Sequence, residues 1–324
     1  MPLKDVYSLV KEDLEAVGQR FRQLVDSQKD RFPELHDMLG QVLIGGKIIR
    51  PTLTLISGKF YDYDRQKLLP MATASELLHI ATLVHDDAID YASIRRGRQT
   101  INKIWGLERA VILGDFLFAM AGRFATDTGN LRAVNLFTQA LENISRGELK
   151  QGFSAFKLEQ TYEDYIERIA GKTAALFAMA TESGAVLSQA PEECVQRLKE
   201  YGYNMGIAFQ IVDDILDFVS TEQEMGKPVA SDLAQGTLTL PSLLLIQKHT
   251  QENPVKRLFK NEGDKQKNID QAVAMVSESG FIEESYRVAG EYKEKACRNL
   301  EQLPDKPARQ SLLALAEYIM RRRK

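Results

Sequence analysis

Residues 70–91 of the chain read PMATASELLHIATLVHDDAIDY, an apolar stretch that ends in a cluster of aspartates. Its apolar side chains recur with the 3.6-residue period of an α-helix and do not alternate as in a strand. Pro70 suits the first turn of such a helix, which we expect to run to about Tyr91. The stretch therefore predicts a largely apolar helix with acids near its C-terminal end.

The same helical periodicity continues through the chain, and no run shows the alternation of β-branched residues that is typical of a strand. Further helices are expected at residues 5–27, 51–60, 110–127, 133–153, 162–187, 191–218, 241–248, 269–278, 281–303 and 307–324. The predicted fold class is all-α. Residues 220–236 are expected to form a functional loop, and residues 251–268 a solvated connection.

Composition excludes several classes of protein. The 324 residues are 44% hydrophobic and 27% charged with a net charge of −3, so a folded core is expected and no basic field favours nucleic acid. Cys194 and Cys297 lack CxxC spacing, which argues against a disulfide framework or zinc site and favours a cytoplasmic location. No signal peptide is recognised, and no run reaches the about 18 apolar residues of a membrane span, although peripheral membrane contact during product release stays open.

One short motif occurs twice, as DDAIDYAS at residues 86–93 and as DDILDFVS at residues 213–220. Each copy places two acids at i and i+4 on one helix face. Their neighbours are apolar, which argues against an ordinary solvated surface. Six gathered carboxylates would repel by about 3 kcal/mol per pair at about 5 Å and an effective dielectric of about 20, unless cations separate them. The candidate metal ligands are Asp86, Asp87, Asp90, Asp213, Asp214 and Asp217.

Mg²⁺ fits this set, because it prefers hard oxygen ligands and is often completed by substrate phosphates. The pattern therefore predicts a metal–diphosphate site. Since both motifs are expected to serve that one site, we predict a single domain over residues 1–324, although the length alone would favour two.

Basic residues with phosphate-binding character lie around the two motifs. They belong to GGKIIRP (45–51), IRRGR (94–98), AGKTA (170–174) and MGKP (225–228), and His79 lies about two turns before Asp86. Arginine matches phosphate oxygens bidentately, and lysine adds a point charge. Each segment taken alone is equally typical of an ordinary turn or loop, and His79 of a core histidine; their order around the acids favours a shared site.

Taken together, these segments resemble the trans-isoprenyl (polyprenyl) diphosphate synthase family over nearly the whole chain. Within that family the chain looks most like the catalytic subunits of bacterial heptaprenyl diphosphate synthases. The resemblance is carried, in order, by GGKIIRP (45–51), ELLHIATLVHDDAIDYASIRRG (76–97), GDFLFA (114–119), RGELKQ (146–151), GKTAALF (171–177), FQIVDDILDF (209–218) and GKPVASDLAQGTLTLP (226–241).

The resemblance implies a single helical bundle around a central cavity, which condenses isopentenyl diphosphate with an allylic diphosphate. It implies three Mg²⁺ ions held with the bound diphosphate, and a homodimer or a heterodimer with a dissimilar small subunit. The implied residues are Lys172, Thr173, Gln210 and Lys227 for catalysis, Arg95, Lys172 and Lys227 for the allylic diphosphate, and Lys47, Arg50, His79 and Arg96 for isopentenyl diphosphate.

Product length is expected to depend on Leu78, Ala81 and Thr82, which lie before the first acid cluster. Farnesyl-making relatives carry aromatic residues in this region, so the small Ala81 favours a product longer than geranylgeranyl diphosphate. Ordinary helix packing by alanine stays open as an alternative.

Other functions are weighed against this one. A terpene cyclase would not need a second DDxxD or the GGKIIRP site, and a membrane prenyltransferase would need spanning helices. A short-chain synthase, and a non-catalytic regulatory subunit, remain open. The basic tail at residues 320–324, MRRRK, either folds over the isopentenyl diphosphate or forms a solvated end.

Overall fold

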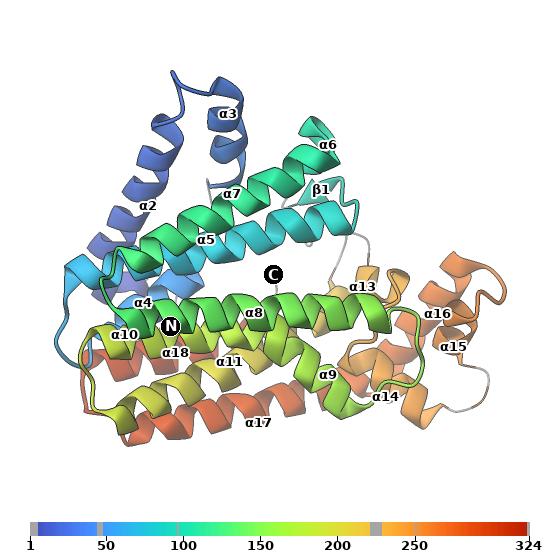
Figure 1. The fold of residues 1–324 in the computed structure, drawn as a ribbon. Helices are drawn as coiled ribbons and strands as arrows, with labels where there is room; N and C mark the ends of the chain where they lie inside the picture. The colour runs from blue at the N-terminus through green and yellow to red at the C-terminus, as the bar shows by residue number, and fades with distance from the viewer. Residues whose placement is uncertain are drawn as a thin grey trace. The chain divides into compact units, whose positions relative to one another are not determined.

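The computed structural model of the chain describes residues 6–43, 48–95, 97–220, 229–249, 251 and 253–322. Over this part the all-α prediction is confirmed (Figure 1). In chain order the helices are η1 (Ser8–Val10), α2 (Lys11–Asp26), α3 (Pro33–Val42), α4 (Ile49–Gly58), α5 (Arg65–Ile89), α6 (Ile101–Trp105), α7 (Leu107–Thr126), α8 (Leu131–Ser154), α9 (Tyr162–Ile169), the π-helix η2 (Ala170–Ala174), α10 (Ala175–Leu187), α11 (Glu192–Val219), α13 (Ser231–Ala234), α14 (Leu240–Lys248), α15 (Pro254–Phe259), α16 (Lys265–Glu278), α17 (Phe281–Glu301) and α18 (Pro307–Arg321).

A small β-hairpin interrupts this helical pattern. Strands β1 (Ile94–Arg95) and β2 (Arg98–Gln99) pair antiparallel, with Ile94 opposite Gln99. The hairpin follows α5 and includes Ile94, Arg95 and Arg98 of the IRRGR segment, which was expected to be a loop. It therefore holds Arg95 in extended backbone shortly after the first acid cluster.

Two expectations about the helices were wrong. Pro70 lies inside α5, because the helix already begins at Arg65, where the Asp64 side chain caps it by accepting a hydrogen bond from the Gln66 backbone N–H. The segment 251–268 is not merely a solvated connection, since its residues 254–259 form α15 and bury Val255 and Phe259.

The chain divides into two compact units. One contains Met1–Leu141, Leu176–Gly202 and Asn299–Leu315, and the other contains Glu142–Ala175, Tyr203–Arg298 and Ala316–Lys324. The prediction that all 324 residues form one domain around a central cavity stays a prediction.

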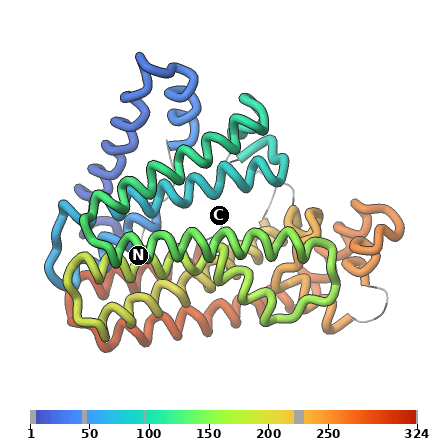
Figure 2. Tube along the Cα trace, viewed as in Figure 1, coloured from blue at the N-terminus to red at the C-terminus, as the bar shows by residue number. Residues whose placement is uncertain are grey.

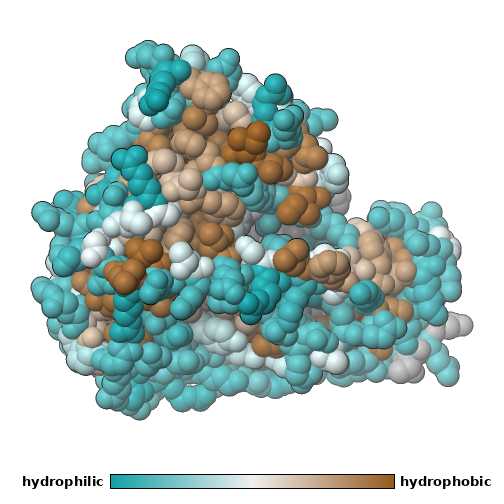
Figure 3. All heavy atoms as spheres, viewed as in Figure 1, coloured by the Kyte–Doolittle hydropathy of each residue, from teal (hydrophilic) through white to brown (hydrophobic). Residues whose placement is uncertain are grey.

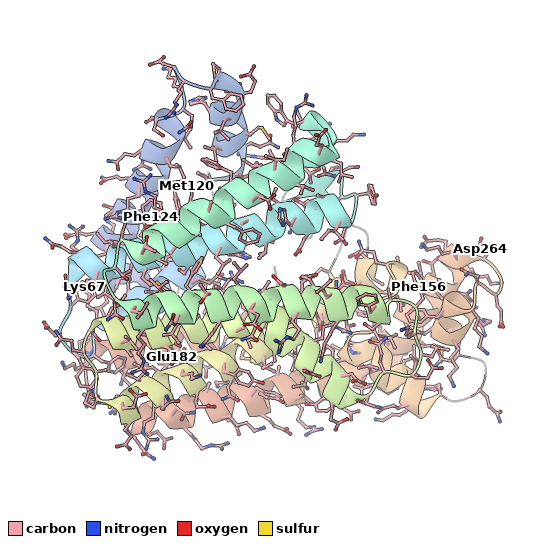
Figure 4. The ribbon with its side chains drawn as sticks, viewed as in Figure 1. Lys67, Met120, Phe124, Phe156, Glu182 and Asp264 are labelled. Atoms are coloured by element: carbon pink, nitrogen blue, oxygen red, sulfur yellow. The ribbon has the colours of Figure 1, made fainter. Side chains whose placement is uncertain are left out.

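In the first unit, α5 and α7 run side by side, and α2 packs beside α3 (Figures 1 and 2). The α5–α7 contact is close at Gly114, where an added Cβ atom would lie 2.1 Å from the His85 imidazole. Figure 4 shows Phe124 on α7, and the guanidinium carbon of Arg20 on α2 lies 5.8 Å from the centre of its ring. The end of α5 that carries the first acid cluster is thus fixed on α7.

In the second unit, an apolar core joins α9, α11, α14, α15 and α16. It includes Tyr165, Ile211, Ile215, Leu240 and Phe259, all buried. Helix α8 meets η2 backbone to backbone, since an added Cβ atom at Gly147 would lie 2.9 Å from the Lys172 amide nitrogen. These contacts place the residues around the second acid cluster.

A buried carboxylate on α2 supports the first unit. Asp13 accepts hydrogen bonds from the Tyr63 hydroxyl and the Arg65 Nε, both at 2.6 Å, and Lys59 Nζ lies 3.7 Å away. Burial alone would raise the pKa of Asp13, but the two hydrogen bonds and the charges of Lys59 and Arg65 outweigh it and hold the pKa below its usual value.

We expect Asp13→Asn to lower the free energy of unfolding at pH 7 by about 1–3 kcal/mol, because it removes a charged acceptor from buried donors. The depressed pKa means that this contribution is present above the unfolded-state pKa and is lost as pH falls through the folded-state pKa. Denaturant titrations at pH 7 and at low pH measure it. Glu12→Gln, at the exposed neighbouring position, is the control; equal stability of the two variants at pH 7 would contradict the assignment.

Candidate functional site

The first acid cluster lies at the C-terminal end of α5. Asp86 and Asp87 lie in its last turn and Asp90 is the residue that ends it. Asp87 is buried, Asp86 is half-buried and Asp90 is exposed. Burial raises the pKa of the Asp87 carboxyl, against the effect of Arg95, whose Nε donates a hydrogen bond to Oδ1 at 2.7 Å. The structure therefore joins a predicted diphosphate-binding arginine to the first cluster.

His85 fixes this end of α5 from the side. Its Nε2 lies 2.9 Å from the backbone oxygen of Val111, and its ring stacks edge-on against Phe118 on α7 at 5.2 Å between ring centres. The predicted substrate residue His79 also lies on α5, about two turns before Asp86, and is half-buried.

The second acid cluster lies on α11, and its three members differ in their surroundings. Asp217 is buried, and its carboxylate accepts from the Ser231 hydroxyl at 2.9 Å and from the Asp232 backbone N–H at 3.2 Å. It thereby caps the short helix α13. Asp213 keeps 44% of its side chain exposed and forms a 2.8 Å ion pair with Arg322.

Asp214 is the buried centre of a hydrogen-bond network. Its Oδ2 accepts from the Tyr165 hydroxyl and its Oδ1 from Gln210 Nε2, both at 2.8 Å. Burial raises the pKa of Asp214 to about 7, and the charge of Asp232 adds to this. The two hydrogen bonds and the charge of Arg168 act in the opposite direction.

Two predicted catalytic residues lie on the π-helix η2. The Thr173 hydroxyl donates to Gln210 Oε1 at 2.6 Å, and Lys172 Nζ lies 2.7 Å from Glu148 on α8. A π-helix is rare and often occurs at functional sites. The wider turn places Thr173 against α11, so the structure brings the predicted catalytic residues Thr173 and Gln210 together with Asp214, which the sequence had assigned to metal binding.

The remaining predicted residues are placed as follows. Arg50 lies in the first turn of α4, is buried, and has its guanidinium carbon 5.2 Å from the centre of the Phe177 ring. Leu78 and Ala81 are fully buried on α5, and Thr82 is half-buried. Lys47, Arg96 and Lys227 lie outside the described residues.

The sequence did not identify three residues that contact the candidate site or act on its charges. Tyr165 is seven residues before Lys172, two helical turns, and this spacing could have placed both on one helix face. Arg168, also buried, donates to the backbone oxygen of Leu238 and to the Gln160 side chain. Glu148 is part of the RGELKQ motif, but its pairing with Lys172 joins segments that are far apart in the sequence.

The interpretation of the basic tail as a solvated end was wrong for Arg322. This side chain is 5% exposed, stacks on the Phe209 ring at 3.7 Å, and donates to the Phe209 backbone oxygen at 2.7 Å. Pairing with Asp213 explains its burial, because a buried guanidinium needs an acceptor. Arg323 and Lys324 lie outside the described residues.

The carboxylates offer the hard oxygen donors that Mg²⁺ prefers. Within the described part of the chain, however, no three His, Cys, Asp or Glu side chains lie together as a ready-made metal site. Mg²⁺ commonly takes only one or two carboxylates together with substrate phosphates, so the donor set fits a site that the substrate completes.

In the same described ranges, no helix has both the length and the apolar character needed to cross a membrane.

Comparisons with known proteins agree on one family. Residues 32–276 match the family described as Polyprenyl synthetase. Heptaprenyl diphosphate synthase component 2 of Bacillus subtilis is 37% identical over 324 residues, covering 100% of this chain and 92% of that protein. A solved decaprenyl diphosphate synthase from Rhodobacter capsulatus is 35% identical, with a TM-score of 0.91 over 100% of both chains. A polyprenyl synthase from Caulobacter crescentus, solved with calcium and isoprenyl diphosphate, is 30% identical, with a TM-score of 0.91 over 100% of this chain and 98% of that one.

The contact between α8 and η2 yields a test of the site's geometry. We expect Gly147→Ala to lower the free energy of unfolding by about 1–3 kcal/mol, because its Cβ atom would meet the Lys172 backbone nitrogen at 2.9 Å. Gly152→Ala is the matched control on the same helix, since its Cβ atom would have no neighbour within 4 Å. Thermal unfolding measures both; a Gly147 variant as stable as the control would show that the close contact does not exist.

Proposed function

Because the chain belongs to the polyprenyl synthetase family, we propose that it joins isopentenyl diphosphate head to tail (1′-4) to an allylic diphosphate. The observation that carries the proposal is the full-length match, together with two acid clusters that each have a supporting network of side chains. The product proposed is an all-trans polyprenyl diphosphate longer than geranylgeranyl diphosphate.

We propose that both aspartate clusters hold Mg²⁺ on the allylic diphosphate, with a division of labour between exposed and buried members. Asp86, Asp90 and Asp213 retain solvent exposure and are assigned as direct ligands. The buried Asp87, Asp214 and Asp217 accept hydrogen bonds from protein donors and are assigned as supports. The Caulobacter relative solved with calcium and isoprenyl diphosphate supports a divalent cation beside such a substrate.

The cations divide between two substrates in this proposal. Arg95 and Lys172, with Lys227, bind the allylic diphosphate; Arg50 and His79, with Lys47 and Arg96, bind isopentenyl diphosphate. Arg95 and Lys172 are each paired with a carboxylate, Asp87 and Glu148 respectively. Charge-assisted pairs of this kind hold long basic side chains in place, so less freedom is lost when a diphosphate binds.

The reaction breaks the allylic C1–O bond, and its electron pair leaves with the diphosphate. The double bond of isopentenyl diphosphate then attacks the allylic C1 through its own C4, and the proton lost from C2 passes to the departed diphosphate. Bound Mg²⁺ supplies stabilisation of the charge on the leaving group. The basic side chains add fixed positive charge at the same oxygens, and Thr173 and Gln210 lie beside the reacting carbons in this proposal.

The relatives differ in the length named for their products, from geranylgeranyl through heptaprenyl to decaprenyl. The heptaprenyl and decaprenyl relatives are 37% and 35% identical to this chain, and the geranylgeranyl relative from Lactobacillus brevis is 30% identical, which supports a medium-to-long product here. The full burial of the small residue Ala81, with Leu78 and Ala74 before it on α5, is compatible with a chain-length role.

We propose that the working assembly contains a second copy of the chain. The outer faces of α6 and α7 expose Ile104, Leu107, Val111 and Ile112, and Figure 3 shows apolar atoms gathered over α7. Exposed apolar side chains gathered in this way are typical of protein–protein contact. The name component 2 of the Bacillus relative points to a dissimilar subunit as the other possibility.

The purified chain, incubated with farnesyl diphosphate, isopentenyl diphosphate and Mg²⁺, is expected to make products longer than geranylgeranyl diphosphate. Chelation of Mg²⁺ should abolish them. Its mass in solution should be twice the 36.5 kDa of one chain. A single short product would overturn the proposed length. No product, together with tight Mg²⁺-dependent binding of diphosphate, would point to a missing dissimilar subunit and overturn the proposal that the chain acts with its own second copy.

We expect Ala81→Phe to shorten the products, because in this proposal an aromatic ring on α5 would block the path of the growing chain before the first acid cluster. Product length is the measured quantity, since an enzyme that is merely destabilised by a larger side chain makes fewer chains but not shorter ones. An unchanged length distribution at reduced rate would assign Ala81 to ordinary helix packing.

A further inference from the structure

A line of hydrogen bonds crosses the second unit from α9 to η2. The Tyr165 hydroxyl donates to Asp214, the Gln210 amide donates to the other oxygen of Asp214, and the Thr173 hydroxyl donates to the Gln210 carbonyl. The three distances are 2.8, 2.8 and 2.6 Å. Tyr165 forms one end of this line, and it belongs to none of the sequence motifs.

The hydroxyl of Tyr165 is placed in an apolar core. The side chain is fully buried among residues such as Ile211, Ile215 and Leu238. A phenylalanine would fill the same space without removing a hydroxyl from water. The partner that satisfies this hydroxyl is the carboxylate of Asp214, so its place in the core is explained by that carboxylate.

The carboxylate also decides the direction of every other bond in the line. Both oxygens of Asp214 act as acceptors in the structure, so the Gln210 amide turns its NH₂ group to Asp214 and its oxygen to Thr173. The Thr173 hydroxyl is then oriented as a donor. If Asp214 rotated away, nothing else in the line would distinguish the two ends of the Gln210 amide.

We propose that Tyr165 is a positioning residue for the prenyl transfer: it holds Asp214, which orients Gln210 and, through Gln210, Thr173. This inference rests on the proposed function, which places Gln210 and Thr173 beside the reacting carbons. Tyr165 itself touches neither substrate; its effect reaches the reaction through three hydrogen bonds.

A double-mutant cycle of Tyr165→Phe and Thr173→Val tests the connection. Tyr165→Phe should lower kcat about tenfold, the effect of losing one hydrogen bond to a charged group, and leave KM for both substrates within about twofold. The double variant should be about as slow as the slower single variant, because both changes break the same line. Independent effects that multiply, or a wild-type kcat in Tyr165→Phe, would overturn the proposal.

Tyr162→Phe is the matched control. Tyr162 lies on the same helix, packs against the same core, and hydrogen-bonds Tyr292 instead of Asp214. The Tyr162→Phe variant also loses one tyrosine hydroxyl group, but it should keep the wild-type kcat. A kcat loss equal to that of Tyr165→Phe would mean that any tyrosine hydroxyl in this core matters equally, and the proposal would fail.

A measurement that needs no turnover separates this inference from the proposed function. In protein labelled with [¹³C-methyl]threonine, Thr173→Val identifies the Thr173 signal by its disappearance. Tyr165→Phe should shift that signal and Tyr162→Phe should not, even if the wild-type chain makes no product. An unmoved signal in Tyr165→Phe would overturn the inference while leaving the function intact. If Tyr165→Phe does not fold, Asp214→Ala makes the same NMR test, because it removes the acceptor that orients Gln210; an unmoved Thr173 signal would again overturn it.

Discussion

The burial of carboxylates within apolar helices is the constraint on which the candidate site depends. Removing a carboxylate from water is costly unless protein donors replace the water. Asp87 receives Arg95, Asp214 receives Tyr165 and Gln210, and Asp217 receives Ser231. Each of these donors comes from another turn or another element, so satisfying the acids also ties together the segments around them.

Helices with strong periodicity could be predicted from the sequence, because the side chains that face the core recur with the 3.6-residue period of the helix itself. The predicted helix 162–187 corresponds to the run α9, η2 and α10, and residues 281–303 to α17. Boundaries and short helices were harder. The cap at Asn253, which accepts from the Val255 N–H, and Pro254 in the next position are local signals for α15, but charged neighbours concealed them. Pro70 lies inside α5 because the cap at Asp64 starts the helix six residues before it.

The acids themselves could be recognised because their spacing is local and their chemistry is specific. Their surroundings could not be, because the partners are distant in the sequence. Tyr165 lies 49 residues before Asp214 in the chain, and only the packing of α9 on α11 brings the two together. Arg322 looked like part of a solvated tail, since charge runs at chain ends usually are, and its stacking on Phe209 depends on where α18 ends. Exposure, which separates Asp213 from Asp214, is likewise a property of the folded chain.

The π-helix η2 has a consequence for insertions and deletions. Its wide turn contains one residue more than an α-turn would, so the helical register differs on its two sides. A deletion of one residue between Ala170 and Ala174 would give an uninterrupted α-helix with more regular backbone hydrogen bonding. The helices on the two sides would keep nearly the same orientation, because five π-helical residues turn by about 410° and four α-helical residues by about 400°. The local geometry would be lost, since the wide turn is what places Thr173 against Gln210. A shortened chain could therefore keep its helix packing and still lose the alignment of its reactive side chains.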